Sequence, residues 1–84
     1  MFSEYPRGRY VTGAPFTALD VLNGLDAMTG DHDAYAHVSR MPSERWDSVR
    51  AFIRERGLVR TEGQLTSLTW RGRRLRHWLR RGFR

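Results

Sequence analysis

The sequence predicts one small domain of the α+β class, mostly α-helical, in the order helix, helix, helix, β-hairpin, helix. Three observations predict it. The chain has 84 residues, a length that supports a single hydrophobic core. Its composition, 39% hydrophobic and 12% aromatic, is too apolar for a disordered tail. Apolar residues recur at helical spacing in four segments, and an alternating stretch lies between the third and the fourth.

The first 15 residues are predicted to form an extended arm. Two Pro and two Gly, at positions 6, 8, 13 and 15, argue against a long helix there. A short strand over residues 9–12 is compatible with the same pattern.

The first helix is predicted over residues 17–29. Thr17 followed three residues later by Asp20 is close to a capping box, which satisfies free backbone N–H groups where a helix starts. Gly30 suits the C-terminal stop. The apolar side chains at helical spacing are Leu19, Leu22, Leu25 and Met28.

A short second helix and a longer third helix follow. Asp31 or Asp33 can cap the second helix, which carries Tyr35, Val38 and Met41 on one face. Pro42 cannot lie inside a helix but suits the first turn of the next one. The third helix is therefore predicted over residues 42–56, ended by Gly57. Its inward side chains are Trp46, Val49, Phe52 and Ile53.

A β-hairpin and a last helix complete the domain. Residues 58–61 and 64–68 are the predicted strands, with Glu62-Gly63 as the tight turn. Thr69 can cap the last helix. Projected at 100° per residue, this helix places Leu75, Trp78 and Leu79 inward, Arg73, Arg76, His77 and Arg80 outward, and Arg74 and Arg81 at the flanks.

Three local features resemble the winged helix-turn-helix family, over residues 16–80. Tyr35-Ala36 followed by Met41 and Trp46 matches the helix-turn-helix, with Ala36 where the two helices touch. Residues 53–59 look like a recognition helix entering the first wing strand, and residues 68–72 like the last wing strand entering a final helix. The resemblance implies three helices, a β-hairpin wing and a C-terminal basic helix. The implied organisation is an arm (1–15), a winged-helix domain (16–81) and a basic tail (82–84).

Two departures from the family's pattern concern its DNA-reading part. Arg40 stands in the tight turn where the family usually has Gly. The predicted outward face of the third helix is also acidic rather than basic, with Arg45 and Arg50 at its flanks; its members are Glu44, Asp47, Ser48, Ala51, Arg54 and Glu55. Carboxylates can accept a hydrogen bond from cytosine, so base reading by this face is still chemically reasonable.

Positive charge is concentrated at the C-terminal end. The formal net charge is +6, and all 15 basic residues are Arg. Residues 71–84 contain seven Arg and no acid, whereas residues 1–70 contain eight Arg and nine acids. Seven like charges repel one another, which favours a polyanion or an acidic partner over a merely solvated face. An anionic membrane is disfavoured as that partner, because the apolar face of the helix is needed to close a small core.

The arm and the Trp residues offer weaker signals. The segment Pro6-Arg7-Gly8-Arg9-Tyr10 resembles the core of an AT-hook, in which Arg-Gly-Arg lies along a narrow minor groove, but Tyr10 stands where that family has its second Pro. An ordinary basic terminus or a strand packed on the core is the favoured interpretation of this segment. Trp46 and Trp78 are predicted to pack in the core rather than to stack on bases, and Trp70 is ambiguous.

Several functions are disfavoured by what the sequence contains. There is no Cys, and His32, His37 and His77 lack metal-ligand spacing. No set of residues is spaced for catalysis, and no apolar run exceeds three residues. We therefore expect a cytoplasmic non-enzyme without cofactor, metal, effector pocket or membrane span.

The first functional hypothesis is a DNA-binding transcriptional regulator that represses by occupying duplex DNA. Its phosphate contacts would be Arg71, Arg73, Arg74, Arg76, Arg80 and Arg81, helped by Arg7, Arg9 and Arg60. Any base reading would come from Ser43, Glu44, Arg45, Ser48 and Arg50 on the third helix. The family resemblance also implies a homodimer, formed through the first helix, the arm or the last helix.

The second hypothesis is a winged helix used for protein contact. It would be an accessory subunit or a small phage-type inhibitor that docks on a protein or nucleoprotein complex. The acidic face of the third helix is what favours it.

Overall fold

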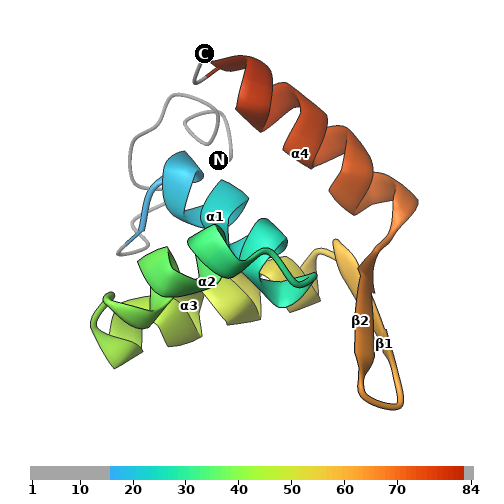
Figure 1. The fold of residues 1–84 in the computed structure, drawn as a ribbon. Coiled ribbons are helices and arrows are strands. Elements are labelled where there is room, and N and C mark those ends of the chain that lie inside the picture. The colour runs from blue at the N-terminus through green and yellow to red at the C-terminus, as the bar shows by residue number, and fades with distance from the viewer. Residues whose placement is uncertain (1–15, 83–84) are drawn as a thin grey trace.

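The computed structural model describes residues 16–82 and has the predicted order of elements (Figure 1). Its elements are α1 (Ala18–Met28), α2 (His32–Ser39), α3 (Ser43–Glu55), β1 (Val59–Glu62), β2 (Leu65–Leu68) and α4 (Trp70–Gly82). The protein is therefore mostly helical with one antiparallel hairpin, which confirms the α+β class. The predicted arm, with Arg7 and Arg9, lies outside the described residues, as do the last two residues of the predicted tail.

Helix α1 starts at the predicted capping box. The Thr17 side chain accepts a hydrogen bond from the backbone N–H of Asp20 at 3.3 Å, and the Asp20 carboxylate accepts one from the backbone N–H of Thr17 at 2.9 Å. The helix ends before Gly30, whose φ of +107° is easily adopted only by a residue without a Cβ. Both predicted ends of this helix are thereby confirmed.

The caps of α2 and α3 follow from single residues. Asp31, and not Asp33, caps α2, since its carboxylate accepts the backbone N–H of Ala34 at 2.9 Å. Pro42 immediately precedes α3, as expected from its fixed φ and missing N–H. Gly57, with φ +65°, follows the end of α3.

The hairpin turn lies one residue later than predicted. Strands β1 and β2 pair in antiparallel register from Val59 opposite Leu68 to Glu62 opposite Leu65. The two turn residues are therefore Gly63 and Gln64, and not Glu62 and Gly63. Gly63 has φ +62°, because a two-residue turn that matches strand twist requires a positive φ at its first position.

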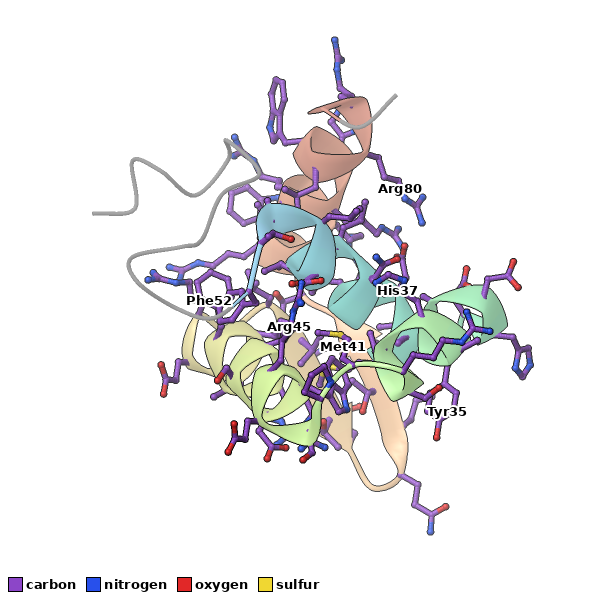
Figure 2. All side chains as sticks on the ribbon, turned by 90° about the vertical axis from the view of Figure 1, so that its left-hand side faces the viewer. Tyr35, His37, Met41, Arg45, Phe52 and Arg80 are labelled. Carbon is purple, nitrogen blue, oxygen red and sulfur yellow. The ribbon has the colours of Figure 1, made fainter. Side chains whose placement is uncertain are left out.

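Helix α1 is the centre of the core. In both views α4 lies on one side of α1 and α3 on the other (Figures 1 and 2). Val21 and Leu25 of α1 are fully buried, as are Val49 and Ile53 of α3. Phe16, Ala18, Leu22, Leu58 and Leu79 complete the cluster around them. Because the other helices pack on α1, the face of α1 that each helix covers determines where the exposed surface of that helix lies.

The buried face of α2 differs from the prediction. Ala34 and Val38 are buried, whereas Tyr35 is 63% exposed and Ala36, the predicted helix contact, is exposed. Positions 34 and 38 lie four residues apart on one face, and position 36 lies about 200° away from position 34. The prediction that Ala36 lies where the two helices touch is therefore wrong, and the buried Ala of this helix is Ala34.

The predicted burial of Leu19 and Trp78 is also wrong. Leu19 is exposed, because Ala18, Val21 and Leu25 form the inward face of α1. Trp78, predicted to lie inward, is exposed as well. The inward positions of α4 are Gly72, Leu75, Arg76 and Leu79, and Trp78 is rotated about 100° from Leu79. Trp46 is half-buried against the core, as predicted.

Candidate nucleic-acid interface

Helix α4 is held by its first turn and by one apolar face. The Thr69 side chain accepts a hydrogen bond from the backbone N–H of Gly72 at 3.1 Å and donates one to the carbonyl of Gly57 at 2.6 Å. Leu75 and Leu79 pack against the core cluster. The opposite side is exposed, and its side chains form what we call the outer face of α4: Trp70, Arg71, Arg73, Arg74, His77, Trp78 and Arg81.

Two Arg residues of α4 turn toward α1 instead of outward. Arg76 and Arg80 form ion pairs with Asp26 at 3.6 Å and 3.1 Å, and the Asp26 side chain is only 13% exposed. Figure 2 shows Arg80 extending from α4. The acid that the sequence of α4 itself lacks is thus supplied by α1. The predicted outward position of Arg76 is wrong, since this residue is half-buried.

The remaining Arg residues of α4 keep their charge exposed. Among residues 16–82, no carboxylate lies within salt-bridge distance of Arg71, Arg73, Arg74 or Arg81. The guanidinium carbon of Arg74 lies 4.9 Å from the ring centroid of Trp70, and that of Arg81 lies 5.5 Å from the ring centroid of Trp78. A cation held over an aromatic ring keeps its charge while losing part of its freedom. The outer face of α4 is therefore an array of exposed cations and aromatic rings without an acid.

The predicted reading residues on α3 are occupied by contacts within the domain. Arg45 donates to the carboxylate of Asp20 from Nε at 2.9 Å and from Nη2 at 2.5 Å, and Asp20 is only 3% exposed. Arg50 pairs with Asp47 and lies over the ring of Trp46 at 5.3 Å. Both flanking cations of α3 are thus engaged with neighbouring side chains of this chain.

The other predicted contact residues on α3 and the hairpin offer a phosphate few hydrogen-bond donors. The Ser48 hydroxyl donates to the backbone carbonyl of Glu44 at 3.0 Å. Ser43 and Glu44 are exposed at the start of α3. Arg60 lies on β1, 3.8 Å from Glu62, with both side chains largely exposed. The exposed surface of α3 and the hairpin is consequently mixed in charge, unlike the outer face of α4.

The structure divides the predicted site residues between two surfaces. The outer face of α4 holds Arg71, Arg73, Arg74 and Arg81. Ser43, Glu44, Ser48 and Arg50 lie on α3, on the other side of α1 (Figures 1 and 2). Because α1 separates the two helices, a straight partner that lies along the outer face of α4 does not also lie along α3.

A hollow of about 480 Å³ lies between the start of α1 and the turn that joins α2 to α3. Leu19, Met41 and Pro42 supply apolar walls, while Arg40 and the Asp20–Arg45 pair supply polar ones; Met41, His37 and Arg45 are labelled on this side in Figure 2. The exposure of Leu19 is explained by its position in this open hollow. Within residues 16–82, no cluster of three His, Asp or Glu side chains could hold a metal ion.

Comparison with known protein families, with curated proteins and with solved structures gives no match for this chain. None of the helices in the described part of the chain has the length and apolar content needed to cross a membrane.

Proposed function

We propose that this chain is a small nucleic-acid-binding protein of the winged-helix type whose affinity comes mainly from the outer face of α4. One observation carries the proposal: this face presents four exposed Arg side chains, and no acid among residues 16–82 lies within salt-bridge distance of them. A surface of this kind gains free energy when phosphates replace the small counterions that would otherwise neutralise it. The proposed contacts are Arg71, Arg73, Arg74 and Arg81.

Repression by occupancy of duplex DNA, as a homodimer, is the specific form that the winged-helix resemblance supports. In that form α3 would enter a groove, and any reading of bases would fall to residues at its start. The exposed candidates there are Ser43 and Glu44, since Arg45 and Arg50 are held by Asp20 and Asp47. In this form most of the affinity for nucleic acid comes from α4, and α3 contributes a smaller part.

The test is a titration of a labelled duplex of about 20 base pairs at several salt concentrations. Four phosphate contacts predict a slope of log K against log[salt] of about −3 to −4. The triple variant R71Q/R73Q/R81Q is expected to reduce this slope to about −1. The matched triple variant R40Q/R54Q/R60Q removes the same charge from the C-cap of α2, from α3 and from β1, and it is expected to leave most of the slope in place.

Two results would count against the proposal. Equal losses from both triple variants would mean that only net charge matters. Binding without salt dependence, or no binding at all, would remove the basis for a phosphate-binding surface altogether.

Docking on a protein through α3 is a second candidate function, and the separation of α3 from α4 favours it. Glu44, Asp47 and Glu55 of α3 are exposed, and the helix α3 lies across α1 from α4 (Figures 1 and 2). These carboxylates can meet a basic protein while α4 holds a polyanion, although Asp47 is also paired with Arg50 of the same helix. A small accessory subunit or a phage-type inhibitor of a nucleoprotein complex would use both surfaces in this way.

A further inference from the structure

Two tryptophans of α4 are exposed where a folded domain usually buries such rings. Trp70 is 62% exposed and Trp78 is 59% exposed. Large aromatic rings gain most of their stabilisation from burial, so two exposed rings on one helix face indicate a surface that is covered by a partner. Their separation of eight positions corresponds to about 12 Å along the helix and a rotation of about 80°. Both rings therefore project from the outer face of α4.

Each of these rings is contacted by an Arg of the same face. Arg74 lies over Trp70 and Arg81 over Trp78, at 4.9 Å and 5.5 Å from the ring centroids. The His77 ring also meets the Trp78 ring edge to face, with centroids 5.7 Å apart. Because a guanidinium covers one side of a ring, the other side is left for a further planar group. These contacts restrict the motion of the rings in part, and any such restriction lowers the side-chain entropy lost on binding.

We propose that the outer face of α4 binds single-stranded nucleic acid, with unpaired bases stacking on Trp70 and Trp78 while neighbouring Arg side chains contact the phosphates. This inference rests on the proposed nucleic-acid binding and names the class of strand. Interleaved aromatic rings and cations are the chemistry that single strands require, since every unpaired base has a free ring face and every nucleotide a phosphate. In a duplex the ring faces of the bases are covered by neighbouring base pairs, so the two Trp rings would add little there.

The same face fits a membrane or a protein core less well. Leu75 and Leu79, the aliphatic side chains of α4, point inward to the core cluster. The two Trp rings are thus separated by charged side chains rather than joined into an apolar seam. Insertion into a bilayer interface needs a continuous apolar face, and the centre of a protein interface is depleted in charge. The observed alternation of ring and cation satisfies neither requirement.

The experiment compares binding of the full chain to a labelled oligo(dT) of about 16 nucleotides and to a duplex of the same length. Trp70→Leu and Trp78→Leu remove a ring and keep an apolar, helix-forming side chain. Each is expected to weaken oligo(dT) binding by about 10-fold and to change duplex binding by less than about 2-fold. Trp70→Phe and Trp78→Phe retain a ring and are expected to keep most of the affinity. Leu65→Ala, which trims an exposed apolar side chain on β2, is the matched control and should change neither.

The possible results separate this inference from the proposed function. If the Leu variants bind oligo(dT) as tightly as the unaltered chain, stacking is overturned while phosphate binding by α4 stands. If the unaltered chain binds neither oligonucleotide, both fail. If it prefers vesicles containing phosphatidylserine to oligo(dT), and the Leu variants lose that binding, the face is a membrane surface and the inference is overturned. Circular dichroism of every variant, including the Phe and Leu forms, tests whether the fold is retained.

Discussion

Asp26 determines how much of the positive charge of α4 is available to a partner. Its carboxylate pairs with both Arg76 and Arg80, although it belongs to α1 and lies 50 positions or more from them in the sequence. An exposed ion pair contributes little to stability, but a carboxylate that is largely covered holds its partners more firmly. Asp26 therefore holds two Arg side chains against the domain. Without this carboxylate, the phosphates of a polyanion would attract both of them.

Asp26→Asn is expected to strengthen nucleic-acid binding by releasing these Arg side chains. The slope of log K against log[salt] should become steeper by about one unit for each Arg that then meets a phosphate. The free energy of unfolding should fall by less than about 1 kcal/mol, because Arg80 is about half exposed. Salt-dependent titration and urea denaturation measure the two effects. Asp33→Asn, which removes an equal charge from α2, is the control, and equal effects from both variants would mean that Arg76 and Arg80 play no part.

At the level of elements, two glycines allow helices to approach closely. A Cβ on Gly24 of α1 would lie 2.8 Å from the Val49 side chain of α3. A Cβ on Gly72 of α4 would lie 2.0 Å from the backbone carbonyl oxygen of Leu58. That carbonyl cannot easily move, because it accepts the backbone N–H of Thr69 at 3.0 Å. The start of α4 is thus fixed against the end of the α3–β1 connection by the absence of one side chain.

Gly72→Ala is accordingly expected to destabilise the fold by about 2–4 kcal/mol, despite the better helix propensity of Ala. Gly82→Ala is the matched control in the same helix, since a Cβ there meets nothing within 4 Å. It should be neutral or stabilising by a few tenths of a kcal/mol. Urea denaturation of both variants gives the comparison. A Gly72→Ala variant as stable as the unaltered chain would mean that α4 does not approach Leu58 closely.

The order of the elements and the ends of α1 and α3 could be predicted from the sequence, because their signals are local. The Thr17–Asp20 capping box, the Pro42 helix start and the Gly30 stop each depend on neighbouring residues only. The inward faces of the two helices with few apolar residues could not be predicted in the same way. Helix α2 buries only Ala34 and Val38, so its pattern is too short to fix a rotation.

The rotation of α4 depends on residues that lie far away in the sequence. Hydrophobicity alone places Trp78 inward and Arg76 outward. In the structure Arg76 lies toward α1 because Asp26 accepts it there, and Gly72 contacts Leu58 because it has no side chain. These two contacts turn Trp78 to the outside, where it joins Trp70. No local pattern contains that information, so the sequence predicts Trp78 in the core and leaves the role of Trp70 ambiguous.

At the level of the whole molecule, charge is divided between two sides of α1. The sequence predicted the division along the chain, with the surplus of Arg in residues 71–84. It could not predict that α4 and α3 pack on different sides of α1, since this depends on which faces of α1 each helix covers. The two surfaces can therefore serve different partners, and each can be altered without touching the other.

Charge reversal on α3 distinguishes the possible roles of that helix. Glu44→Lys and Asp47→Lys, each made alone, are compared with Asp33→Lys, which changes the net charge equally from α2. If α4 alone binds nucleic acid, all three should raise the affinity by the same small factor, because charges more than about 10 Å from the strand are largely screened at 0.1 M salt. A larger rise for the α3 variants would mean that α3 itself contacts the polyanion. If α3 instead docks on a protein, a pull-down after nuclease treatment should recover one stoichiometric partner. The Glu44→Lys and Asp47→Lys variants should lose this partner, and the Asp33→Lys variant should retain it. Each reversal adds the same charge, and Asp47→Lys also breaks the ion pair with Arg50. A difference from Asp33→Lys that Glu44→Lys and Asp47→Lys share therefore reports the position of α3, whereas a rise confined to Asp47→Lys reports the released Arg50.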